Sequence, residues 1–166
     1  RNIDKIYTRI LDNWEKKNIK STLSLLHCVS SYPVPDDEAN ISVISELIKK
    51  YPNAIIGYSD HTIGKEAALC AVSLGAKIIE KHFTIDKNYS DFRDHQLSAD
   101  PAEFSDLVKS IRKIEKIKGN GKIKIQDCEK EISSQIRRSI AAKTKLDKDY
   151  LITLDDLIYV RPGNVI

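Results

Sequence analysis

Residues 54–84, AIIGYSDHTIGKEAALCAVSLGAKIIEKHFT, decide the fold class of this chain. An apolar run of strand length, 54–59, is followed by an alanine-rich stretch with helical character at 64–74. Gly75 suits the left-handed position after a helix, and a second apolar run follows at 77–84. A buried strand, a helix and another buried strand in this order are typical of a parallel βαβ unit. The stretch therefore predicts an α/β fold with a parallel sheet.

The same alternation continues on both sides of this stretch. Apolar spacing predicts a helix over 3–14, a strand buried on both faces over 22–30 and a helix over 40–51. A polar loop is expected over 86–98, and Asp100-Pro101-Ala102-Glu103 has the pattern of a capped helix start. Three strands cannot close a (β/α)8 barrel, which needs eight strands and about 250 residues. A small open sheet and part of a barrel both remain possible at this point.

The composition changes after Gly119-Asn120-Gly121, which interrupts the helical pattern. Beyond it we predict a helical linker over 127–139, a strand over 140–146, a turn at Asp147-Lys148-Asp149 and a helical turn capped by Thr153. Arg161-Pro162-Gly163-Asn164 is expected to form a further turn. The predicted domains are residues 1–119, a linker at 120–139 and a second domain starting at 140–166.

Charge and hydropathy exclude several classes of protein. The 166 residues contain 27 Lys and Arg against 24 Asp and Glu, and the basic residues are scattered among acids, which argues against nucleic-acid binding. No apolar run approaches the roughly 20 residues of a membrane span. The three cysteines are widely spaced and form no CxxC motif, so we expect reduced thiols in a cytoplasmic protein. Because Met is absent, we expect the chain to be a segment of a longer protein.

Two histidines follow neighbouring strands of the predicted sheet. His61 comes after the strand at 54–59, and His82 lies near the end of the strand at 77–84. Adjacent parallel strands end at the same edge, so both imidazoles are expected there. They could be two ligands of one metal whose other ligands are oxygens, or two hydrogen-bonded histidines.

Carboxylates and hydroxyls occur at the same strand ends. Glu80 shares a strand face with His82 and Lys81 has the other face, so Glu80 is either functional or part of a structural ion pair. Ser30 and Tyr32 follow the first strand and Ser59 ends the second. Such hydroxyls can hold phosphate or sugar oxygens, although they are also ordinary turn formers. The charged loop 91–95, which contains Asp94, is either part of the site or a solvated loop.

Five motifs, in the order LLHCVSSYPVP, IGYSDHTIG, GAKIIEKHFT, RDHQLSADP and VRPGN, resemble the sialic acid synthase family. The resemblance spans residues 23–164. It implies a TIM barrel, a linker and a small antifreeze-like (SAF) domain. This chain would then contain the last three βα units of the barrel, the linker and the start of the SAF domain.

The resemblance also implies an activity. The family condenses phosphoenolpyruvate with an N-acyl hexosamine such as N-acetylmannosamine, releases phosphate and uses Mn²⁺ or Mg²⁺. The implied site residues are His61 and His82 for the metal, Ser30 and Ser59 for the phosphate, Tyr32 and Asp94 for the sugar, and Arg161 reaching into the partner's site in a domain-swapped homodimer. We expect the carboxylates of Asp94 and Glu80 to be the catalytic groups.

The resemblance further implies that other phosphate-binding and sugar-binding residues lie on five barrel strands that this chain lacks. We therefore expect the 166-residue chain to be inactive alone. Two alternatives stay open: a synthase for another keto-sugar acid, and a non-catalytic module that binds a sugar or another chain.

Overall fold

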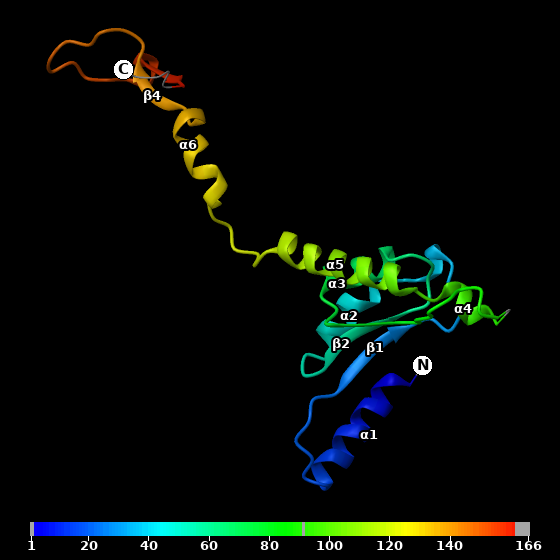
Figure 1. Ribbon diagram of the computed structural model, residues 1–166. Helices are drawn as coiled ribbons and strands as arrows, with labels where there is room; N and C mark the ends of the chain where they lie inside the picture. The colour runs from blue at the N-terminus through cyan, green and yellow to red at the C-terminus, as the bar shows by residue number, and fades with distance from the viewer. Residues whose placement is uncertain (1, 91, 162–166) are drawn as a thin grey trace. The chain divides into compact units, whose positions relative to one another are not determined.

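The computed structural model describes residues 2–90 and 92–161 (Figure 1). The chain divides into two compact units, Arg1–Gly119 and Asn120–Ile166, which are described separately below. Among the described residues, no helix has both the length and the apolar character needed to cross a membrane.

The first unit is built on a three-stranded parallel sheet, so the predicted α/β class with a parallel sheet is confirmed. Its strands are β1 (Ser24–Cys28), β2 (Ile55–Asp60) and β3 (Ile78–Lys81), in the order β1-β2-β3. The helices are α1 (Ile3–Lys16), α2 (Val43–Lys50), α3 (Glu66–Leu74), the short α4 (Arg93–Leu97) and α5 (Pro101–Lys118), with a 3₁₀ turn η1 (Asp36–Glu38).

The core of this unit lies between one face of β2 and helices α2 and α3. Its buried members are Ile44, Tyr51, Ile56, Tyr58, Ala71 and Ala76. Because strand side chains alternate, Ile56 and Tyr58 face these helices while Gly57 and Ser59 face the other way. Helix α5 packs on α3 in a further layer (Figure 1).

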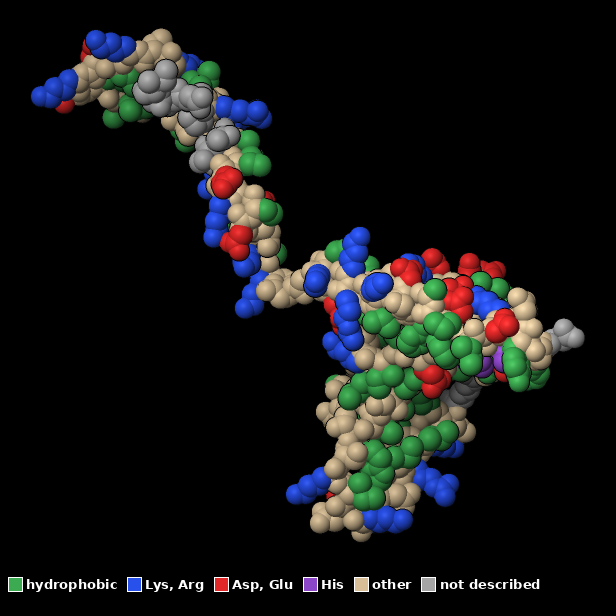
Figure 2. All heavy atoms as spheres, in the orientation of Figure 1, with side chains coloured by type: hydrophobic (Ala, Val, Ile, Leu, Met, Phe, Trp, Pro, Cys, Tyr) green, Lys and Arg blue, Asp and Glu red, His purple; other side chains and the backbone are tan. Residues whose placement is uncertain are grey.

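The prediction of a strand buried on both faces is wrong for β1, and the prediction of a buried strand is wrong for β3. Every residue of β1 is half-buried, and β3 contains half-buried residues and one exposed residue, whereas β2 is buried from Ile56 to Asp60. Within the described residues, β2 has a neighbour strand on each side and the other two strands have one neighbour each. Large apolar side chains are therefore left on the surface of this unit (Figure 2).

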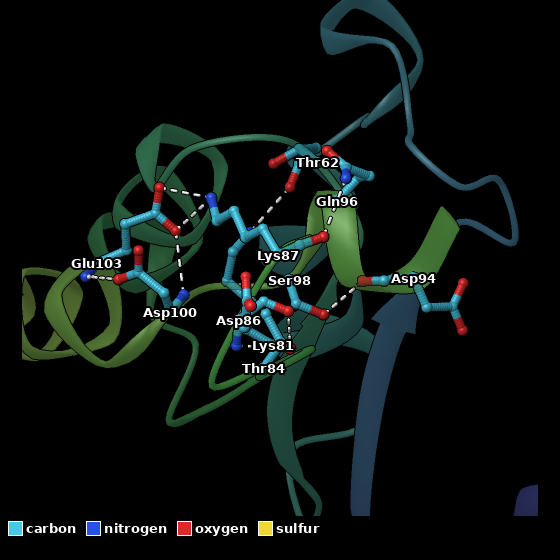
Figure 3. Close-up of polar contacts among 10 residues, drawn as sticks. All are labelled: Thr62, Lys81, Thr84, Asp86, Lys87, Asp94, Gln96, Ser98, Asp100 and Glu103. Atoms are coloured by element: carbon cyan, nitrogen blue, oxygen red, sulfur yellow. Dashed lines mark hydrogen bonds and ion pairs between the residues drawn. The ribbon is translucent and has the colours of Figure 1, made fainter. Parts of the chain in front are cut away.

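The start of α5 and the end of α3 have the capping that the sequence predicts. Asp100 accepts a hydrogen bond from the Glu103 amide (2.8 Å), and the Glu103 carboxylate accepts one from the Asp100 amide (3.1 Å), which completes the expected capping box (Figure 3). Gly75 has φ 112°, the positive value expected after α3.

The expected polar loop over 86–98 instead contains helix α4. Its last turn is closed by the Ser98 hydroxyl, which donates to the Asp94 carbonyl (2.5 Å), while the Gln96 amide donates to the Lys87 carbonyl (2.9 Å). After α4 the chain returns to the end of β3, because the Ala99 amide donates to the His82 carbonyl (2.8 Å). A five-residue helix offers too few turns for an apolar period to be visible in the sequence.

The second unit contains α6 (Lys130–Ile136) and an antiparallel pair of strands, β4 (Ser139–Ala142) and β5 (Leu157–Val160). It also has two 3₁₀ turns, η2 (Asp127–Glu129) and η3 (Leu154–Asp156). Thr153 caps η3 as expected, and Asp149 has φ 67° in the turn. The predicted strand over 140–146 is too long and β5 was not predicted. Residues 162–164 of the expected final turn lie outside the described residues.

Gly57 provides a test of the sheet packing. A Cβ atom at this position would lie 2.7 Å from the Ile78 carbonyl oxygen and 3.0 Å from Leu26 Cγ. Gly57→Ala should therefore lower the free energy of unfolding by about 1–3 kcal/mol, measured by urea denaturation. Gly119→Ala is the control, because its Cβ would meet nothing within 4 Å and only its φ of 58° is unfavourable. If Gly57→Ala lowers the free energy of unfolding no more than Gly119→Ala does, close packing between β2 and β3 does not exclude a side chain at position 57.

Candidate functional site

The carboxyl ends of β2 and β3 bring His61 and His82 together. His61 is buried directly after β2, and His82 is half-buried directly after β3. Their ring centroids are 5.1 Å apart and the ring planes are nearly perpendicular, at 79°. The two imidazoles, 21 residues apart in sequence, therefore lie side by side at the sheet edge.

Backbone contacts determine how His61 is oriented. Its Nδ1 lies 3.0 Å from the Val29 carbonyl oxygen, which can only accept, so Nδ1 carries the proton and Nε2 keeps a free lone pair. The His61 carbonyl in turn accepts a hydrogen bond from the Val34 amide (3.0 Å). Metal-binding histidines commonly donate their second ring N–H to a backbone carbonyl in this way. His61 thus has the tautomer that a metal ligand requires.

Tyr32 brings the third strand end into the site. Its ring centroid lies 4.4 Å from that of His61 and 5.7 Å from that of His82, and the residue is 37% exposed. Tyr32, His61 and His82 are called the His–Tyr cluster below. Ser30, two residues earlier in sequence, is exposed and its side chain makes no hydrogen bond to another described residue.

Ser59 and Glu80 face each other on the same side of the sheet as the predicted site. They are register partners, and the Ser59 hydroxyl donates to Glu80 Oε1 over 2.5 Å. Glu80 is therefore hydrogen-bonded to a hydroxyl, and the structural ion pair considered from the sequence is not what the described residues form. A serine hydroxyl has one proton, so Ser59 can donate to a phosphate oxygen only after it leaves Glu80.

The opposite side of the same strands holds a buried ion pair. Lys81 Nζ lies 2.8 Å from Asp60 Oδ2, and the two side chains are 4% and 0% exposed. Lys81 also donates to the Thr62 carbonyl (2.9 Å), a contact that Figure 3 shows. Alternation along the strand predicts Lys81 on this face, but its partner Asp60 was not predicted. Asp60 becomes visible as this partner only through the β2–β3 register, which pairs it with Lys81.

Burial also affects the tyrosine beside this pair. Burial of the Tyr58 hydroxyl, reinforced by the Asp60 carboxylate, raises the pKa of Tyr58 above its usual value. Tyr58 therefore remains neutral throughout the physiological range.

Asp94 lies on α4, and the structure shows no polar contact between its side chain and the His–Tyr cluster among the described residues. Its carboxylate points away from the other labelled side chains in Figure 3. The neighbouring His95, which the sequence analysis did not select, lies with Nδ1 2.9 Å from the Thr84 hydroxyl. Because Thr84 follows β3 closely, this contact holds α4 against the end of that strand.

Arg161 is exposed, directly after β5 in the second unit. The two units are not placed relative to each other, so its expected role in a partner's site stays a prediction.

The residues at the sheet edge fit a divalent cation that takes only part of its shell from protein. Within residues 2–90 and 92–161 no group of three or more His, Cys, Asp or Glu side chains could hold a metal. Two imidazoles with open positions can hold a divalent cation when oxygen atoms of substrate and water complete the coordination. The His61 tautomer supports this fit.

Two curated relatives resemble most of the chain. N,N'-diacetyllegionaminic acid synthase of Legionella pneumophila is 41% identical over 146 residues, which are 88% of this chain and 40% of the relative. Human N-acetylneuraminate-9-phosphate synthase is 36% identical over 141 residues, covering 85% of this chain and 39% of the relative. The chain thus spans about two fifths of the length of these relatives.

A solved structure agrees with these relatives. The N-acetylneuraminic acid (sialic acid) synthetase of Leptospira borgpetersenii, in complex with citrate, is 47% identical with a TM-score of 0.63, over 70% of this chain and 40% of that one. The model of the NeuB family matches residues 2–123. This chain therefore belongs to the NeuB family, whose members here include sialic acid synthases.

Proposed function

We propose that this chain forms the metal-binding and substrate-binding edge of a nonulosonic acid synthase. The reaction joins phosphoenolpyruvate to an N-acyl hexosamine such as N-acetylmannosamine and releases phosphate. The observation that carries the proposal is the convergence of His61 and His82, with His61 Nε2 free to bind a metal. The names of the relatives support the same class of reaction.

In this proposal His61 and His82 hold Mn²⁺ or Mg²⁺ through ring nitrogens. The bound cation would polarise the acceptor's aldehyde as a Lewis acid. Tyr32, which is partly exposed and contacts both rings, would present its hydroxyl to the sugar next to that aldehyde.

The condensation needs a proton for the former aldehyde oxygen and a base for the water that attacks the enol carbon. Glu80 and Asp94 are the carboxylates proposed for these transfers. Glu80 already accepts a hydrogen bond at the site face of β3, whereas Asp94 has a carboxylate without a hydrogen-bond partner among the described residues. Ser30 and Ser59 would bind the phosphate group.

The same proposal covers the architecture. Residues 1–119 would be the last three βα units of a TIM barrel, residues 120–139 a linker and residues 140–166 the start of a SAF domain. The whole protein would be a cytoplasmic, domain-swapped homodimer in which Arg161 reaches the partner's site. The remaining strands would supply the other phosphate and sugar ligands.

The first experiment tests metal binding by titrating the purified chain with Mn²⁺ and recording the electron paramagnetic resonance signal of free Mn²⁺. His61→Ala and His82→Ala should each weaken binding by at least about 10-fold, because each removes one of two protein ligands. The control is His27→Gln, since His27 Nε2 lies against the Ala39 carbonyl (2.9 Å) and its ring stacks with buried Tyr58, on the helix-covered face. Unchanged binding in both alanine variants would refute the assignment.

A second experiment tests the reaction. The aligned segment of the Legionella synthase is replaced by this chain's residues, and phosphate release from phosphoenolpyruvate and an N-acetylated hexosamine is measured. We expect Mn²⁺-dependent turnover, and a fall in kcat of about 100-fold or more on Asp94→Asn. The 166-residue chain alone should release no phosphate. A folded chimera that binds the sugar without turnover would instead support the non-catalytic alternative.

A further inference from the structure

Three residues outside the proposed ligand set form a closed hydrogen-bonded group beside both histidines. Lys81 Nζ donates to Asp60 Oδ2 (2.8 Å) and to the Thr62 carbonyl (2.9 Å). The amide and the hydroxyl of Thr62 both donate to Asp60 Oδ1 (2.9 and 2.7 Å). We call Asp60, Thr62 and Lys81 the clamp.

The clamp is buried and its polar atoms are paired. Asp60 and Thr62 are almost completely buried, and so is the side chain of Lys81. Both Asp60 oxygens accept hydrogen bonds, and no buried side-chain polar atom among the described residues lacks a partner. Charges out of water persist only in a geometry that satisfies them, so the arrangement tolerates little displacement.

The clamp residues are sequence neighbours of both proposed metal ligands. Asp60 and Thr62 flank His61 on either side, and Lys81 directly precedes His82. The ion pair joins register partners of β2 and β3, and Asp60 and Lys81 lie on the helix-covered side while Ser59 and Glu80 lie on the other. The clamp therefore fixes the spacing between the two strand ends whose backbone carries the two imidazoles.

Metal coordination makes this backbone spacing important. Metal–nitrogen bonds are about 2 Å long and tolerate small errors only, so two rings on separate strands must be held at a set distance. The His61 ring is oriented by Val29, but among the described residues no hydrogen bond orients the ring of His82. The position of His82 then depends on its backbone, which is held by Lys81 on one side and by the Ala99 amide, which donates to the His82 carbonyl (2.8 Å), on the other.

We propose that the clamp of Asp60, Thr62 and Lys81 is a positioning device that holds His61 and His82 at the separation needed to bind one divalent cation. This inference rests on the proposed metal-binding function. The clamp residues touch no substrate in this scheme, and their effect passes through the two histidines.

Two other roles for the ion pair predict different results. If it acted only through its charges, Lys81→Gln would strengthen cation binding and Asp60→Asn would weaken it, because the two charges have opposite signs. If it served only the stability of the core, both variants would unfold at lower temperature and bind Mn²⁺ as well as the unmodified chain. Positioning predicts weaker binding in both.

The experiment titrates Mn²⁺ into the 166-residue chain and its variants, with thermal unfolding recorded without metal. We expect Mn²⁺ affinity to fall about 10-fold in Asp60→Asn, in Lys81→Gln and in the double variant, which leaves the net charge of the pair at zero. Electron spin-echo spectroscopy should count two imidazole nitrogens on Mn²⁺ in the unmodified chain and fewer in these variants. Thr62→Val, which keeps the ion pair, should also weaken Mn²⁺ binding. If the charge variants do not fold, this variant tests whether the clamp positions the two histidines.

The matched control is the exposed Lys50–Asp4 pair, which has the same 2.8 Å separation between a lysine and an aspartate far apart in sequence. Asp4→Asn with Lys50→Gln should leave Mn²⁺ affinity unchanged. Opposite changes in the two single clamp variants, or unchanged affinity and two imidazole nitrogens in the folded clamp variants, would overturn the inference. Failure of the proposed function would look different, because binding would then survive the loss of His61 and His82 as well.

Discussion

The parallel register between β2 and β3 is the constraint on which the first unit depends. It pairs Ser59 with Glu80 and Asp60 with Lys81, so neighbouring residues on one strand serve opposite faces. On the helix side the register closes a buried ion pair above the core. On the other side it leaves a serine, a glutamate and two histidines at one edge. The site and the core thus share one backbone arrangement.

The energetic weight of this arrangement falls on the Asp60–Lys81 pair. Removing one partner of a buried ion pair costs on the order of 3–5 kcal/mol, because the remaining charge stays out of water. The exposed pairs of this unit, such as Lys49–Glu46, belong to a class worth about 0–1 kcal/mol each. Breaking this single buried pair should therefore lower the stability of the unit more than breaking any one of its surface pairs.

Sequence reasoning succeeded where local chemistry decides the outcome. The βαβ unit over 54–84, the capping box at Asp100 and the positive φ of Gly75 all follow from neighbouring residues. The meeting of the two histidines followed from topology, since parallel strands end at one edge. What could not be predicted depends on non-local contacts. Lys81 had no visible partner until the register was known, and the burial of β1 depends on strands beside it.

The alternation of faces along β3 also has an evolutionary consequence. Inserting or deleting one residue between Ile78 and Lys81 would turn Lys81 toward the site and His82 toward the helices, because side chains alternate with a period of two. Length changes in this segment should therefore be purged by selection. Residues 86–90 carry no such restriction, since they lie outside the strand pairing. The length of that segment can change while the two histidines stay where they are.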